Sequence, residues 1–216
     1  GSTKLKIISR PHYAYCIFNA CQLASKLGLK SISVIEFGVA TGNGLVCTEE
    51  IAVELERLFD MKIEIYGFDS SQGLPKPKDY RDLPYHWKEG FFNMDYEKLK
   101  NKLQKTKLVI GNLKDTSTTF FEKYTPAPIG AIFHDLDFYS STKIALNLFK
   151  ENKRFFLPRI FNYFDDIVGT EIELYNDFTG ERLAIQEFND ENQDIKISPC
   201  YNLICQNNTL YWYHQI

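Results

Sequence analysis

The chain has 216 residues, 44% of them hydrophobic, and this length and composition fit one α/β domain with a full core. Its formal net charge is −3 and no basic block is present, so no nucleic-acid groove is indicated. The sequence contains no run of about 18 apolar residues, so no membrane span is expected. Gly1-Ser2 is typical of a cloning remnant, and a single domain is therefore expected over 3–216.

The five cysteines are odd in number and scattered, and no pair has the spacing of a zinc site. The N-terminus lacks the charged, apolar and small-residue pattern of a signal peptide. Reduced cysteines in a cytoplasmic protein are therefore expected. The sequence leaves the oligomeric state open, a homo-oligomer included.

Apolar residues recur at helical spacing from Ile17 to Leu27, and Gly28 is placed to end this first helix. Strands are then predicted at 33–38, 63–68, 107–110, 129–133 and 159–164, and helices at 48–59, 96–103 and 141–149. This alternation of strands and helices predicts a doubly wound, mostly parallel α/β sheet.

The C-terminal segment differs, because two aromatic-rich runs at 201–206 and 209–215 flank the turn residues Asn207-Asn208. This pattern predicts a hairpin that adds an antiparallel strand to the edge of the sheet. Such an edge is unusual for a dinucleotide-binding Rossmann domain and normal for a class I methyltransferase. The expected fold is therefore a seven-stranded, Rossmann-like methyltransferase sheet.

The segment Glu36-Phe37-Gly38-Val39-Ala40-Thr41-Gly42-Asn43-Gly44 follows the first predicted strand directly. Its three glycines allow a tight turn and close approach of a ligand to the next helix. Their spacing departs from the G-x-G-x-x-G of dinucleotide folds and matches the E-x-G-x-x-x-G-x-G of methyltransferases. The turn is predicted to bind S-adenosylmethionine through Glu36, Gly38, Val39, Gly42 and Gly44. A tight structural turn without a ligand is the alternative, and Glu36 either fixes the turn or meets the cofactor's ammonium group.

Asp69 ends the second predicted strand, where a carboxylate can accept hydrogen bonds from both ribose hydroxyls of a cofactor. NAD uses a similar acid, so Asp69 alone does not choose between the two cofactors. Capping of a loop is the alternative role for this residue.

Carboxylates gather after the fourth and fifth predicted strands, at Asp135, Asp137, Asp165 and Asp166. Acids packed at one sheet edge repel each other unless a cation or protons neutralise them. Oxygen ligands suit Mg²⁺, which could hold a substrate hydroxyl while a neighbouring carboxylate removes its proton. If the chain stays extended, Asp135 and Asp137 point the same way. Capping of the following helices is the alternative.

Two further features have two interpretations each. His134, beside these acids, is either a second base or a structural residue at a strand end. The aromatic residues after Gly73, Trp87 among them, either cover the substrate or pack the loop on itself.

These segments together resemble the macrocin O-methyltransferase family of class I enzymes, which methylate sugar hydroxyls. The likeness is carried by Glu36-Phe37-Gly38-Val39, Asp69-Ser70-Ser71-Gln72-Gly73-Leu74-Pro75, Asp135-Leu136-Asp137-Phe138-Tyr139-Ser140-Ser141-Thr142 and Asp165-Asp166. The resemblance implies that Asp135, Asp165 and Asp166 bind Mg²⁺ and that Asp137 is the general base. It places Glu36, Gly38, Asp69 and Ser70 around S-adenosylmethionine, and Asp135 is assigned to the cofactor site as well.

The sequence thus predicts a Mg²⁺-assisted O-methyltransferase that uses S-adenosylmethionine to methylate a hydroxyl of a sugar or another small molecule. A NAD-dependent oxidoreductase of Rossmann type and a non-catalytic nucleotide-binding module are the alternatives. The terminal hairpin and the glycine spacing argue against the oxidoreductase, and the four converging carboxylates argue against the binding module.

Overall fold

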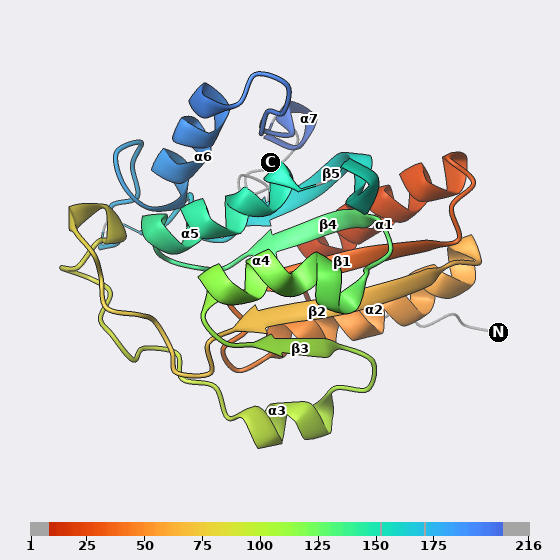
Figure 1. Cartoon of the computed structure of the whole chain (residues 1–216), viewed down its shortest axis with the longest axis horizontal. Helices are drawn as coiled ribbons and strands as arrows, with labels where there is room; N and C mark the ends of the chain where they lie inside the picture. Colours follow the sequence, from red (N-terminus) through yellow and green to blue (C-terminus); the bar gives the residue numbers. More distant parts are fainter. Residues whose placement is uncertain (1–8, 152, 171, 205–216) are drawn as a thin grey trace.

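The computed structural model describes residues 9–151, 153–170 and 172–204, which form one sheet with helices on both faces (Figure 1). The strands are β1 (Ser31–Phe37), β2 (Lys62–Asp69), β3 (Lys107–Ile110), β4 (Ile129–His134) and β5 (Phe156–Phe164). Their order across the sheet is β3-β2-β1-β4-β5, and every pairing is parallel. The five strands and the doubly wound arrangement predicted from the sequence are confirmed.

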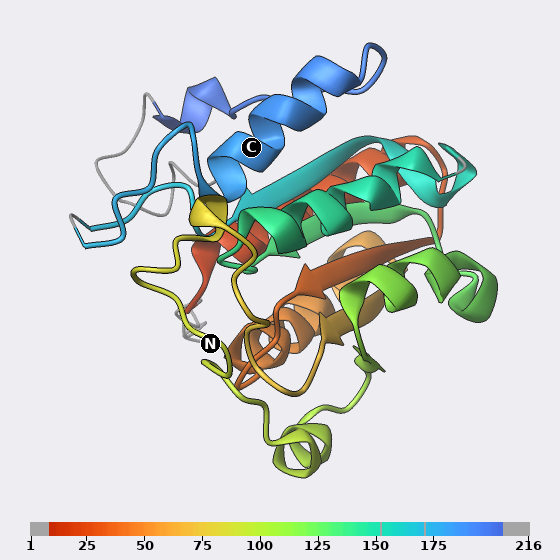
Figure 2. The same cartoon turned by 60° about the vertical axis from the view of Figure 1, so that its left-hand side comes forward.

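Helices cover the two faces in separate groups. The helices are α1 (Pro11–Lys26), α2 (Asn43–Phe59), α3 (Tyr96–Lys102), α4 (Leu113–Tyr124), α5 (Tyr139–Leu146), α6 (Gly180–Glu191) and α7 (Tyr201–Ile204), with 3-10 turns at Tyr80–Asp82, Asn147–Lys150 and Lys153–Phe155. Helices α1 and α2 pack on one face, and α4, α5 and α6 pack on the other (Figure 1, Figure 2). Helix α1 lies against β4 and β5, so the start of the described chain contacts strands that come late in the sequence.

Side chains alternate between the two faces along each strand. In β1, Ile32 and Val34 enter the core beneath α1 and α2, whereas Ile35 and Phe37 enter the core beneath α4, α5 and α6. A strand that is apolar at successive positions is typical of a parallel sheet with both faces covered. The same alternation decides which polar side chains share a face at the ends of the strands.

Helices α4 and α6 are absent from the sequence prediction. Helix α4 is rich in threonine, and its buried apolar residues are Phe120 and Phe121, too few for a clear helical repeat. The Asn112 side chain caps this helix by accepting a hydrogen bond from the Lys114 amide at 2.9 Å. That cap residue is the sequence signal that identifies α4.

The predicted C-terminal hairpin differs from the structure over the part that can be compared. Tyr201–Ile204 forms the short helix α7, at the place where the first hairpin strand was expected to begin. The Leu203 amide donates to the Cys200 carbonyl at 2.8 Å, so backbone groups pair within a turn and not across a ladder. The remaining hairpin residues, 205–216, lie outside the described residues. The described sheet therefore has five parallel strands, and neither seven strands nor an antiparallel edge is shown.

Three cysteines of the described ranges, Cys16, Cys21 and Cys47, are buried and form no disulfide. Burial raises the pKa of the Cys21 thiol to about 12, which keeps this thiol protonated. None of the helices within the described ranges is long and apolar enough to cross a membrane.

Gly38 follows β1 directly and adopts a left-handed backbone conformation, with φ +80°. A Cβ atom at this position would overlap the backbone carbonyl oxygen of Asp135, which follows β4. Gly28, after α1, has a similar φ of +73° but has open space where its Cβ would lie. Substitutions at the two glycines therefore distinguish the effect of backbone strain, present at both, from the effect of steric overlap, present at Gly38 alone.

We expect Gly38→Ala to lower the free energy of unfolding by more than about 3 kcal/mol, because strain adds to an overlap with backbone that cannot rotate away. Gly28→Ala retains only the strain, about 1–2 kcal/mol. Urea denaturation followed by circular dichroism measures both variants. Equal losses in the two variants would contradict the importance of the Gly38–Asp135 contact.

Candidate active site

The glycine turn and the acidic segment meet where β1 and β4 lie side by side. The chain leaves β1 toward α2 on one face and leaves β4 toward α5 on the other, which makes this edge the switch point of the sheet. The Asp135 amide donates to the Phe37 carbonyl at 2.9 Å, and the Gly38 amide donates to the Phe68 carbonyl at 3.0 Å. Ligands of parallel sheets bind in this crevice, and the residues predicted to hold the cofactor and the metal follow the strands at this edge.

Asp69 accepts hydrogen bonds from backbone amides of its own loop and of the glycine turn, which agrees with the capping role given as the alternative for this residue. Its Oδ2 accepts hydrogen bonds from the amides of Val39 at 2.9 Å and Ala40 at 3.0 Å, and its Oδ1 accepts one from the Ser71 amide at 2.6 Å. A carboxylate can accept about four hydrogen bonds, so capacity for a ribose hydroxyl remains. The neighbouring Ser70 hydroxyl donates to the Gly73 carbonyl at 3.0 Å and so shapes the next turn.

The other two glycines of the turn are needed for packing inside the protein. A Cβ on Gly42 would overlap the Leu99 side chain of α3, and a Cβ on Gly44 would overlap the Glu36 carboxylate. The glycine spacing predicts either a turn that a ligand approaches closely or a tight structural turn, and at Gly42 and Gly44 the missing side chains accommodate neighbouring protein atoms. The turn is therefore built tightly whether or not a ligand is bound.

Glu36 is a buried acid with one oxygen unsatisfied. Its side chain is 2% exposed, and the Tyr13 hydroxyl donates to Oε1 at a long 3.4 Å. No hydrogen-bond donor of the described residues reaches Oε2. Burial raises the pKa of Glu36 to about 8, although nearby Arg10 and the Tyr13 hydroxyl act in the opposite direction. A cationic group of a ligand fits beside such an oxygen.

Tyr13 and Arg10 are site residues that the sequence does not reveal. Both lie at the start of α1, and the apolar spacing of that helix indicates burial without indicating a site. Tyr13 is fully buried and stacks on Phe133 of β4 with ring centroids 3.7 Å apart. The packing of α1 on β4 thus places its first turn at the carboxyl edge of the sheet.

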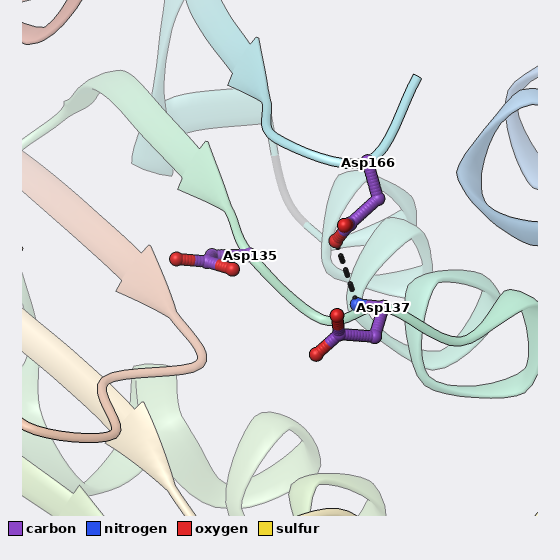
Figure 3. Close-up of side chains that lie close together, drawn as sticks. All are labelled: Asp135, Asp137 and Asp166. Atoms are coloured by element: carbon purple, nitrogen blue, oxygen red, sulfur yellow. Dashed lines mark hydrogen bonds between the residues drawn. The ribbon is translucent and has the colours of Figure 1, made fainter. Parts of the chain in front are cut away.

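Three carboxylates form a compact group at this edge (Figure 3). One oxygen from each of Asp135, Asp137 and Asp166 lies within 4.8 Å of the others, and Asp137 and Asp166 are each 6% exposed. Burial, together with repulsion from neighbouring acids, raises the pKa of all three, that of Asp166 to about 7. Three carboxylates that repel one another, two of them buried and Asp135 partly exposed, fit a hard divalent cation such as Mg²⁺.

Asp137 joins this group through a turn of the backbone and not through an extended strand. Its φ is +58°, a left-handed conformation, so the chain does not stay extended at this position, which was the condition for the two side chains to point the same way. The Asp166 Oδ2 accepts a hydrogen bond from the Asp137 amide at 2.8 Å, which stabilises the turn (Figure 3). The turn brings the Asp137 carboxylate beside Asp135 although strand alternation no longer applies there.

Asp165 lies outside the group of three. The Tyr163 hydroxyl donates to its Oδ1 at 2.6 Å, since residues two apart in β5 share a face. Asp165 nevertheless contributes to the raised pKa values of Asp135 and Asp166. Of the predicted metal ligands, the structure therefore brings together Asp135 and Asp166, and it adds Asp137.

His134 points to the opposite face from Asp135, because neighbouring strand residues alternate. Its ring is fully buried, stacks on Phe164 with centroids 4.1 Å apart, and pairs through Nε2 with Asn162 Oδ1 at 3.3 Å. Burial lowers the pKa of His134 to about 3, so the ring is neutral near pH 7. This placement favours the structural interpretation of His134.

Asp166 is oriented by two residues that the sequence analysis does not identify. The Tyr175 hydroxyl donates to its Oδ1 at 2.7 Å, and the Asp166 amide donates to Glu181 Oε2 at 3.0 Å. Glu181 lies in the first turn of α6 and is fully buried, with Oε1 unpartnered among the described residues. A missed helix thus contributes directly to the site.

The loop after Gly73 that carries Trp87 and other aromatic residues is anchored at the same edge by Asp82, another acid that the sequence does not single out. Asp82 is 1% exposed and accepts hydrogen bonds from the Ser140 amide at 2.8 Å and the Ser140 hydroxyl at 2.9 Å. Trp87 contacts His86 and Phe92 of its own loop, with ring centroids 4.2 Å and 5.6 Å away. The loop therefore packs partly on itself and is fixed beside the start of α5.

No protein-family model matches the sequence, and no curated protein matches it. Among solved structures, the chain is similar to a crystal structure of CalS11, a calicheamicin methyltransferase, with a TM-score of 0.62 and 19% identity, covering 83% of this chain and 72% of that chain. The chain has a methyltransferase-type α/β fold. An apo structure of CalS11, described as a TDP-rhamnose 3′-O-methyltransferase, gives a TM-score of 0.50 and 17% identity, covering 89% of this chain and 78% of that chain. Membership of the macrocin O-methyltransferase family stays a prediction.

The raised pKa of Glu36 predicts a pH-dependent stability. Its ordinary pKa is 4.5 and its folded value is about 8, so the folded chain binds this proton more tightly. The stabilisation is complete below pH 4.5 and is lost as the pH rises through about 8. Glu36→Gln keeps the shape and removes the titration.

Relative to Glu36→Gln, the wild type should therefore lose stability between about pH 5 and pH 9. Urea titrations across this range measure the difference. Glu54→Gln, at an exposed position of α2, is the control and should follow the wild type. Parallel curves for the wild type and Glu36→Gln would contradict the raised pKa.

Proposed function

We propose that the protein is an S-adenosylmethionine-dependent O-methyltransferase, assisted by a divalent cation, that acts on a hydroxyl of a sugar or another small molecule. The observation that supports this most strongly is the compact group of Asp135, Asp137 and Asp166 beside the glycine turn at the switch point. The order β3-β2-β1-β4-β5 is shared with dinucleotide folds, so the strand order alone does not choose the chemistry. The carboxylates favour chemistry that needs a cation and a base.

On the cofactor side, the chain offers a turn with fixed amides and two acids. Glu36 is suited to hold the ammonium group of the cofactor's amino-acid part, because its Oε2 is buried and unpartnered. Asp69 is suited to accept from a ribose hydroxyl, with Val39 and Ala40 already positioned by its other hydrogen bonds. When bound, S-adenosylmethionine supplies an electrophilic methyl group.

On the acceptor side, Asp135 and Asp166 would hold the cation, and Asp137 would remove the proton. A divalent cation lowers the pKa of a hydroxyl that it binds. Asp137 is close enough to both ligands to accept that proton. Methyl transfer is an in-line displacement, so the remaining task of the protein is to align the two partners.

The acceptor class is supported by the similarity to CalS11, which is described as a TDP-rhamnose 3′-O-methyltransferase. A sugar hydroxyl agrees with this chemistry, since an alcohol needs both a base and a cation for deprotonation near neutral pH. S-adenosylhomocysteine should raise the melting temperature of the purified protein, whereas NAD should leave it unchanged. Stabilisation by NAD alone would favour the oxidoreductase alternative.

For catalysis, we expect Asp137→Asn to reduce kcat by about 10²–10⁴-fold, because the amide keeps the shape and loses the basicity. Calorimetry should show unchanged affinity for S-adenosylhomocysteine. Methyl transfer to a panel of nucleotide sugars and other alcohols gives the rate. A near-normal kcat in Asp137→Asn with loss of kcat in His134→Asn would assign the base to His134 instead.

For the metal, the neighbours Asp165 and Asp166 form a matched pair. Asp166→Asn should weaken Mn²⁺ binding by at least about tenfold, the effect of losing one charged ligand from a shared site. Asp165→Asn should change it little, since Asp165 is bonded to Tyr163 and lies outside the group of three. Electron paramagnetic resonance titration with Mn²⁺ measures both affinities. Equal losses in both variants would return Asp165 to the ligand set that the family resemblance implies.

A further inference from the structure

We propose that Arg10 binds the carboxylate of the cofactor's amino-acid part, opposite the ammonium group held by Glu36. This inference rests on the proposed function, because it concerns how the same cofactor is recognised. It adds to the site the residue that precedes the first described helix, outside every motif found in the sequence.

Packing fixes the position of Arg10. The residue precedes α1, its carbonyl accepts the Ala14 amide at 3.2 Å, and Pro11 starts the helix. Its guanidinium carbon lies 4.9 Å from the centre of the Tyr13 ring, and Tyr13 stacks on Phe133. A chain of contacts therefore connects Arg10 to β4 at the edge where the glycine turn lies.

Arg10 is a half-buried cation among acids, yet it has donors to spare. It interacts electrostatically with Glu36, Asp135 and Asp165. Within the described residues, its guanidinium makes neither a hydrogen bond nor an ion pair. A guanidinium offers five N–H donors in a planar fork that matches a carboxylate. Arg10 thus has a positive charge and hydrogen-bond donors that match a carboxylate of a ligand.

The second half of the arrangement is Glu36, on the face of the sheet that α1 and α2 cover. Its unpartnered Oε2 is enclosed between Tyr13 and the start of α2, where Gly44 leaves room for the carboxylate. The amino-acid part of S-adenosylmethionine is a zwitterion, with an ammonium and a carboxylate on the same carbon. An acid and a cation side by side complement both charges, and each interaction is a charge-assisted hydrogen bond.

The test removes the two charges separately from protein and ligand. S-adenosylhomocysteine carries the whole amino-acid part, decarboxylated S-adenosylmethionine lacks only the carboxylate, and 5′-methylthioadenosine lacks both groups. Arg10→Gln should lower the affinity for S-adenosylhomocysteine by at least about tenfold and leave the affinities for the other two ligands unchanged. Glu36→Gln should lower the affinities for S-adenosylhomocysteine and decarboxylated S-adenosylmethionine and leave the affinity for 5′-methylthioadenosine unchanged. Isothermal titration calorimetry measures all affinities.

The control is Arg154→Gln, because Arg154 also lies over a ring, 4.7 Å from the centre of Phe155, away from the site. It should change none of the three affinities. An equal loss for all three ligands in Arg10→Gln would overturn the proposal, because Arg10 would then act through the fold. Unchanged S-adenosylhomocysteine binding with tighter Mn²⁺ binding would also overturn it and make Arg10 a counter-ion of the acids. If the wild type bound none of the three ligands, the proposed function itself would fall.

Discussion

The contact between the Gly38 turn and the backbone of Asp135 is the constraint on which the site depends. Two neighbouring parallel strands, β1 and β4, continue to opposite faces, and their exits must pass within van der Waals distance. Only a residue without Cβ permits this at Gly38, and the Asp135 amide then pairs with the Phe37 carbonyl. Because of this contact, the glycine turn and the carboxylate group lie at the same edge of the sheet.

The second constraint is electrostatic. Glu36, Asp135, Asp137, Asp166 and Glu181 each have a pKa raised above its ordinary value, with burial as the first cause. Burying several carboxylates costs free energy unless a cation, a proton or a hydrogen-bond donor compensates. The structure supplies part of that compensation internally, through Tyr13, Tyr175 and backbone amides. A positively charged ligand would supply the rest, because it reduces the electrostatic cost of burying these acids and therefore binds more tightly.

The sequence predicts the strands and the residues at their ends because both follow from local patterns. Apolar runs and the carboxylates after them need no knowledge of distant contacts, and Asp135 and Asp166 lie together as expected. Arg10 and Glu181 could not be predicted in this way, since each reaches the site through the packing of a helix on the sheet. Asp69 shows the same limit at a residue that was singled out, because its hydrogen bonds to Val39 and Ala40 depend on the relative position of two turns. His134 was ambiguous until alternation along β4 placed its ring in the core.

The packing of α1 against β4 and β5 has a consequence for how the chain folds. The first described helix contacts its sequence neighbours β1 and α2 and also β4 and β5, so its full packing needs strands that come late in the chain. The contacts with β4 and β5 join residues far apart in the sequence, and such contacts cost loop-closure entropy and slow folding. During synthesis, the part of α1 that contacts β4 and β5 stays uncovered until both strands have left the ribosome. Arg10 and Tyr13 therefore enter the crevice among the last contacts to form, and an incomplete chain has no complete site.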